Sequence, residues 1–203
     1  MPSSKLESPV EGAPHPGALS RHRGAVIVIG GLGCAVTALG VGSSAGLAAS
    51  LVFTAVAIWA SAHELVTRHV PRTVVISGLV AVVTLQMATA IVIAQPRNLV
   101  MAIVGALIGV AVLVPAHLVT AEAVNTEALL FAALVGAALG WWGPWLVGLG
   151  LVIAFVLGAL IAGPLMFTRY SGRTEFPVVT LLSMSGWLAL VIGSRLAEWY
   201  LPT

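Results

Sequence analysis

The sequence predicts an all-α bundle of transmembrane helices with about seven spans. Three observations predict this fold class: 59% of the 203 residues are hydrophobic, only 8% are charged, and the mean hydropathy is +1.07. A soluble domain carries about 25% charged residues, so this chain cannot build a water-facing surface. The apolar residues also lie in runs near the ~20 residues that cross the hydrocarbon core as a helix. Six or eight helices would fit the same pattern.

Residues 1–23 are polar and rich in Pro, Ser and Gly, and we expect them to form a disordered cytoplasmic tail. The alternative is the n-region of a signal peptide, followed by the apolar run that starts at Gly24. Residues 24–203 are expected to form a single transmembrane domain. Its apolar runs, separated by charge, Pro or Gly, lie at 24–42, 45–63, 73–94, 99–118, 127–142, 145–167 and 177–196.

The basic residues predict the orientation of the chain. With seven spans, the N-terminal tail and every second loop share one side of the membrane, and that side carries seven of the nine Lys and Arg residues. The positive-inside rule therefore predicts a cytoplasmic N-terminus and a multi-pass protein of the plasma (inner) membrane. The net charge of +2 is too small and too scattered for a nucleic-acid-binding face.

Two glutamates form the candidate catalytic pair. Glu64 follows the second run and Glu127 opens the fifth, and the hairpin between them returns both carboxylates to the same membrane face. Two carboxylates at close range share one proton, so one can act as general base on a water while the other polarises a carbonyl. The alternative is structural, because charged residues collect at helix ends and an acid in a first helical turn complements the helix dipole.

A metal site is a competing interpretation, because Glu and His are acceptable ligands. The residues near the expected cytoplasmic face are His63, His69, His117, Glu64, Glu122 and Glu127. No pair of them has the i,i+3 or i,i+4 spacing of a helical His-Glu-x-x-His site, so we expect no metal and no cofactor. The lone Cys34 excludes an internal disulfide, and Gln86 is expected to make an interhelical hydrogen bond.

The segment that contains Glu64 reads Trp59-Ala-Ser-Ala-His-Glu-Leu-Val-Thr-Arg-His-Val-Pro-Arg72. It resembles the first catalytic region of type IV prepilin peptidases, in which an aspartate ends a helix and a basic stretch and Ile/Val-Pro-Asn follow. Glu64 stands at the aspartate position, Arg68 and Pro71 match the pattern, and Arg72 replaces the asparagine.

A second similarity begins at Asn125, and the resemblance as a whole covers roughly residues 50–195. The helix that ends in Leu-Gly-Trp141 is similar to the one that follows the family's Gly-x-Gly-Asp motif. Here Asn125-Thr-Glu-Ala128 replaces that motif. Glu127 takes the aspartate position only with a shift of one residue, and Ala128 takes it without a shift.

The resemblance implies an integral-membrane, aspartic-type endopeptidase that cleaves the leaders of pilin-like precursors at the cytoplasmic membrane face. It implies Glu64 and Glu127 as catalytic residues, and Arg68, Pro71 and Asn125 as substrate-binding or supporting residues. The implied partners are pilin-like precursor proteins and the lipid bilayer. The chain looks like the small, peptidase-only members that serve Flp/Tad-type pili, because one cysteine cannot form the paired Cys-x-x-Cys motifs of the methylating members.

Two alternatives to a peptidase stay open. Glutamate is longer than aspartate by a methylene, and misplacing a catalytic group by about 1 Å can lower a rate about 100-fold. If the longer side chains prevent catalysis, the chain is a catalytically inactive relative that acts as a membrane binding or assembly subunit for a pilin-like or secretion-system partner. A small transporter or channel subunit is the second alternative, although no ionisable residue is expected at mid-membrane.

Overall fold

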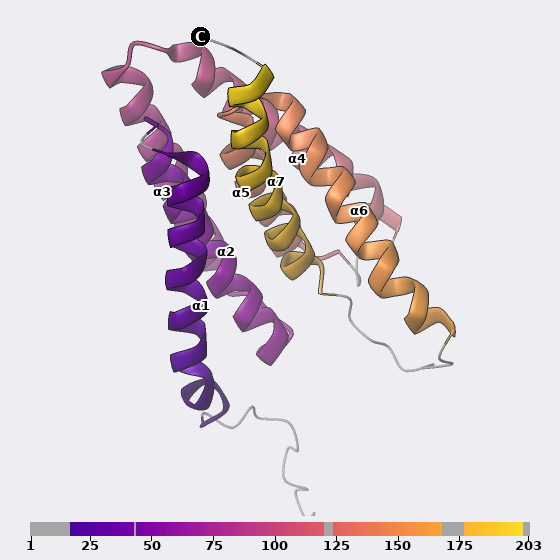
Figure 1. Ribbon diagram of the computed structural model, residues 1–203. Helices are drawn as coiled ribbons and strands as arrows, with labels where there is room; N and C mark the ends of the chain where they lie inside the picture. Colours follow the sequence, from indigo (N-terminus) through magenta and orange to yellow (C-terminus); the bar gives the residue numbers. More distant parts are fainter. Residues whose placement is uncertain (1–16, 43, 120–123, 168–176, 201–203) are drawn as a thin grey trace, which may run out of the picture.

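The computed structural model describes four stretches of the chain and is all-helical in them (Figure 1). The described stretches are residues 17–42, 44–119, 124–167 and 177–200. Their helices are α1 (Gly17–Val41), α2 (Leu47–Thr67), α3 (Arg72–Val92), α4 (Pro96–Val119), α5 (Thr126–Gly140), α6 (Pro144–Phe167) and α7 (Val178–Tyr200). Five of these helices are long and apolar enough to cross a membrane, which supports the predicted membrane-embedded helix bundle.

Local sequence signals explain where the helices begin and end. Pro71 precedes α3, and Pro96 and Pro144 are the first residues of α4 and α6, where a missing N–H costs no helical hydrogen bond. Six predicted runs agree with the helices to within four residues at each end. Helix α1 differs, because it begins at Gly17 and includes seven residues expected in the tail; residues 1–16 lie outside the described part of the chain.

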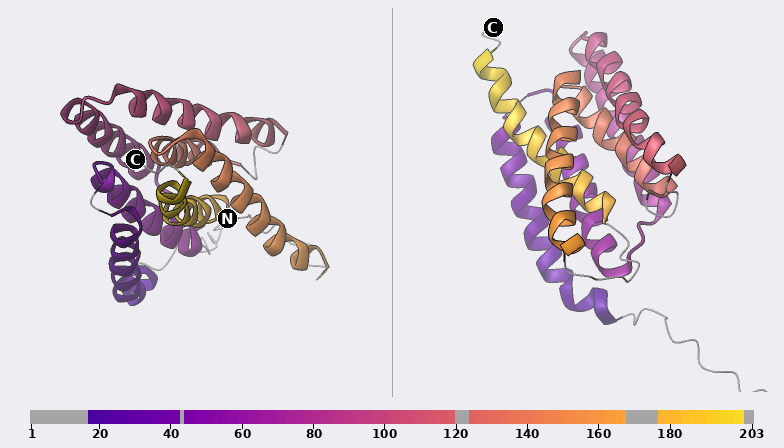
Figure 2. Two further views of the ribbon diagram at one scale, coloured as in Figure 1. Left: turned by 45° about the horizontal axis from the view of Figure 1, so that its top comes forward. Right: turned by 90° about the vertical axis from the view of Figure 1, so that its right-hand side faces the viewer.

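Helix α5 is the short central helix of the bundle. Its 15 residues span about 22 Å at 1.5 Å per residue, which is less than the ~30 Å of a hydrocarbon core. Ten of those residues are buried, and α3, α4, α6 and α7 all pack against it (Figure 2). Since neighbouring helices rather than lipid surround α5, it can be shorter than a spanning helix and apolar on every side.

Glycines bring α4 and α5 into backbone contact. Gly105 and Gly109 of α4 face Gly136 and Gly140 of α5, and each pair forms a Gly-x-x-x-Gly sequence. A Cβ atom added at Gly136 would overlap the carbonyl oxygen of Gly105, and one added at Gly105 would overlap that of Gly136. Small residues at this spacing allow close approach of helices in lipid, so these four glycines serve helix packing.

Hydrogen bonds from polar side chains join α1, α2 and α7 and join α3 to α5. Thr37 of α1 and Thr54 of α2 lie with their Oγ1 atoms 3.0 Å apart, and the Trp187 indole of α7 donates to Thr37 Oγ1 at 3.0 Å. Gln86 of α3 donates from Nε2 to the Ala137 carbonyl of α5 at 2.9 Å. The predicted interhelical hydrogen bond of Gln86 is therefore confirmed. Lipid offers such polar groups no partner, so each bond favours the assembled bundle.

Replacing Gly136 with alanine is expected to lower the free energy of unfolding by about 1–3 kcal/mol, because the new methyl group would force α4 and α5 apart. Thermal unfolding of the purified protein in detergent measures the loss. Gly148→Ala is the matched control, since a Cβ at Gly148 meets no atom within 4 Å. Equal losses in the two variants would show that the α4–α5 contact is not the cause.

Candidate functional site

The Glu64 carboxylate binds the N-terminus of α7. Its Oε1 accepts a hydrogen bond from the Val179 N–H at 3.0 Å, and its Oε2 accepts from the Thr180 N–H and the Thr180 hydroxyl, both at 2.6 Å. These donors lie in the first turn of α7, where backbone N–H groups have no partner within the helix. Glu64 is only 9% exposed, so it caps α7 from a neighbouring helix and places negative charge at the positive end of the helix dipole.

The chain reversal after α2 sets the position of Glu64. Arg68 adopts the left-handed conformation with φ of 60°, and its N–H donates to the Glu64 carbonyl at 2.8 Å, which closes the last turn of α2. Val70 is buried, and Pro71 directly precedes α3. The predicted supporting residues Arg68 and Pro71 therefore lie in a short reversal of the chain. This reversal leaves Glu64 one turn before the end of α2, facing α7.

The histidines of this region contact the backbone. His63 Nδ1 lies 2.6 Å from the His69 carbonyl oxygen and 2.8 Å from Thr67 Oγ1, and its ring stacks on Trp59 with centroids 4.9 Å apart. His117 Nδ1 is hydrogen-bonded to the carbonyl oxygen of Val124, just before α5. Among the residues that the structure describes, no three His, Cys, Asp or Glu side chains are grouped to hold a metal ion. Glu122 lies outside those residues.

Glu127 lies in the first turn of α5, and its carboxylate makes no hydrogen bond with Glu64. Asn125 caps α5 by accepting the Ala128 N–H at 2.9 Å, and Ala128 itself is 1% exposed in the core. Glu127 is half-buried, and no hydrogen bond between described residues involves its carboxylate. The starts of α5 and α7 are neighbours, because Val124 and Val178 line the same cavity. The structure thus places both glutamates at one end of the bundle and directs the Glu64 carboxylate to α7.

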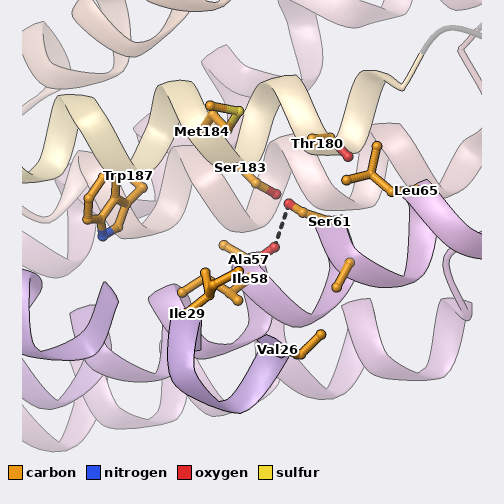
Figure 3. A pocket seen from close by; sticks show the side chains of 11 residues that line it. Val26, Ile29, Ala57, Ile58, Ser61, Leu65, Thr180, Ser183, Met184 and Trp187 are labelled. Atoms are coloured by element: carbon orange, nitrogen blue, oxygen red, sulfur yellow. Dashed lines mark hydrogen bonds between the residues drawn. The ribbon is translucent and has the colours of Figure 1, made fainter. Parts of the chain in front are cut away.

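A groove beside Glu64 runs between α1, α2 and α7 (Figure 3). Its cavity has a volume of about 260 Å³ and an almost entirely apolar wall. Ile29, Leu65 and Met184 line it, and their side chains are more than half exposed, so the groove opens to the bilayer. Thr180, which holds the Glu64 carboxylate, also lines the groove. We call this feature the α1–α2–α7 groove.

Two serine hydroxyls lie in the wall of the α1–α2–α7 groove, one helical turn deeper than Thr180. Ser61 donates to the Ala57 carbonyl at 2.8 Å, while the buried Ser183 Oγ has no hydrogen-bond partner among the described residues. Their hydroxyl groups point toward one another in Figure 3. Sequence reasoning missed Thr180 and Ser183, because single hydroxyls in apolar runs are common and carry no spacing signal.

Comparisons of the chain with protein-family models, with curated proteins and with solved structures found no match. The resemblance to prepilin peptidases therefore stays a prediction that rests on the residues quoted above. The geometry of Glu64, Glu127 and the α1–α2–α7 groove carries the functional argument.

Replacing Glu64 with alanine is expected to lower the free energy of unfolding by about 1–3 kcal/mol, because it leaves buried donors of α7 without an acceptor. Glu64→Gln keeps one acceptor oxygen and should lose less. Unfolding of the detergent-solubilised protein measures both. Glu127→Ala is the control and should lose under about 1 kcal/mol, the range of a helix-dipole contact. A larger loss in Glu127→Ala than in Glu64→Ala would contradict a capping role for Glu64.

Proposed function

We propose that the chain is a catalytically inactive relative of the prepilin peptidases that acts as a membrane-embedded binding subunit. The observation that carries this proposal is the capping of α7 by Glu64, whose two carboxylate oxygens both accept hydrogen bonds from α7. A catalytic pair needs two carboxylates that share a proton and hold a water. A protonated Glu64 would accept these hydrogen bonds less strongly, because charge-assisted hydrogen bonds are stronger than neutral ones.

The second acid of such a pair also has no support in the local geometry. Ala128 occupies the position of the family's aspartate without a shift, and it is packed in the core. Glu127 lies beside it in the same helical turn, and its carboxylate is not hydrogen-bonded to Glu64. Catalytic groups must be held close to the productive geometry, because errors of about 1 Å lower rates about 100-fold.

The α1–α2–α7 groove supports the binding role. It lies in the apolar part of the bundle, opens to lipid, and ends at Thr180 beside Glu64. We propose that it receives the apolar helix of a pilin-like precursor, the partner that the resemblance implies. A helix lying in the bilayer can pack on its small residues Ala57, Ser61 and Ala62, since small side chains allow close contact between helices. The proposed setting is the plasma membrane, with the N-terminus in the cytoplasm.

An aspartic-type endopeptidase that uses Glu64 and Glu127 is the second candidate function. One observation favours it: α7 starts beside Glu64, and Val178 of α7 shares a cavity with Val124, two residues before α5, so the two glutamates lie at the same end of the bundle. A transporter or channel subunit has less support, because none of the cavities described here is lined by an ionisable side chain.

A leader-cleavage experiment separates the first two functions. The protein is co-expressed with pilin-like precursors from the same genome, beside an active prepilin peptidase as positive control, and each precursor is followed by gel mobility. We expect precursors to stay uncleaved with the wild-type chain and to co-purify with it in mild detergent. Cleavage that disappears in both Glu64→Gln and Glu127→Gln would instead establish a glutamate pair and an active peptidase.

Photo-crosslinking tests the location of the precursor. A photoreactive amino acid at Met184, in the α1–α2–α7 groove, should crosslink the co-expressed precursor. The same amino acid at Val152 of α6 is the matched control, because Val152 is also more than half exposed but does not line the groove. Crosslinks that are equally strong from both positions would argue against binding in this groove.

A further inference from the structure

Gln86 of α3 is buried with only half of its amide satisfied. The side chain is 1% exposed, and its Nε2 donates to the Ala137 carbonyl of α5 at 2.9 Å. Its Oε1 is also buried and has no hydrogen-bond partner among the described residues. Exchanging the positions of Oε1 and Nε2 would not satisfy the amide, because Oε1 would then face the Ala137 carbonyl oxygen and neither oxygen can donate. Gln86 Oε1 therefore lacks a hydrogen-bond donor.

A second groove adjoins this amide, between α3, α4 and α5. Its cavity has a volume of about 270 Å³, and both Gln86 and Ala137 line it. Helix α4 packs far more extensively on α5 than on α3, so an opening remains between α3 and α4. Ile103 and Leu107 of α4 also line the cavity and are more than half exposed, so the cavity opens to lipid. We call this feature the α3–α4–α5 groove.

The depth of Gln86 limits what can supply the donor. Along α3 it lies about 9 Å from Val92 and about 21 Å from Arg72, the two ends of the helix. Water and lipid headgroups lie outside the hydrocarbon core, and acyl chains have no hydrogen-bond donor. A donor that reaches this depth from outside the bundle therefore comes from protein.

The wall of the α3–α4–α5 groove is shaped for a helix. Ala102 and Ala106 of α4 and Ala133 and Ala137 of α5 all line it. Each pair has a spacing of four residues, which presents two small side chains on one face of a helix. Such small-residue pairs let another helix approach closely in a membrane, where packing and interhelical hydrogen bonds drive association.

We propose that the α3–α4–α5 groove binds a transmembrane helix of a partner protein that presents an Asn or Gln amide to Gln86 Oε1. An amide is the fitting donor, because its NH₂ group reaches across to another helix, whereas a Ser or Thr hydroxyl readily donates to the carbonyl of its own preceding turn. This site is separate from the α1–α2–α7 groove and does not depend on the function proposed for Glu64.

Binding of two matched peptides to the full-length protein in phosphatidylcholine vesicles tests the proposal. The probes are Leu/Ala-rich spanning peptides that carry either Asn or the isosteric Leu about 9 Å from one end, which matches the depth of Gln86, and energy transfer reports their association. The Asn peptide should bind wild-type protein about threefold to tenfold more tightly than the Leu peptide, the range of one interhelical hydrogen bond. In Gln86→Leu this difference should disappear. Equal binding of the two peptides to wild-type protein would overturn the proposal.

Two further variants keep the test decisive. Thr84→Val removes a polar side chain of α3 that is exposed and does not line the groove, so the preference for Asn should remain. Ala106→Leu fills the groove and leaves Gln86 unchanged, so it should abolish binding of both peptides even if Gln86→Leu folds poorly. Preferential Asn binding that survives Ala106→Leu would place the peptide elsewhere and contradict the proposal.

Discussion

The hydrogen bonds from the first turn of α7 to Glu64 are the interaction on which the arrangement of this bundle most depends. Helix α7 packs against α1, α2, α5 and α6, so its position sets the position of most other helices. Its first N–H groups have no acceptor within the helix, and that of Val179 is buried. The Glu64 carboxylate of α2 accepts hydrogen bonds from two of them, the N–H groups of Val179 and Thr180, and from the Thr180 hydroxyl.

Contacts between helices elsewhere rely on small residues and buried hydroxyl or amide groups. Lipid chains are as apolar as leucine, so burying apolar surface gives little preference for helix contact over lipid contact. Close packing of Gly105 on Gly136 and the hydrogen bond between Trp187 and Thr37 supply that preference. Gln86 Oε1 and the Ser183 hydroxyl have no hydrogen-bond partner among the described residues. A buried polar atom without a partner in an apolar setting is unfavourable, so each of them marks a place where a further polar group would be stabilised.

The residues that carry the resemblance to prepilin peptidases also have structural roles at helix ends. Glu64 caps α7, Arg68 ends α2 in a left-handed conformation, and Asn125 caps α5. Helix ends in membrane proteins collect polar residues whether or not a reaction takes place there. Glu64 and Glu127 lie at one end of the bundle, as expected from the hairpin between them, and the direction of the Glu64 carboxylate supports the binding role that we propose.

The sequence by itself determined the helical class and nearly all helix boundaries, because hydropathy, proline and helix caps act over a few neighbouring residues. The tertiary structure alone decided that α5 is central, that Glu64 faces α7, and that the amide of Gln86 is half satisfied. The physical reason is that lipid and protein interior are equally apolar. An apolar helix therefore carries no hydrophobic pattern that shows which of its faces will meet another helix.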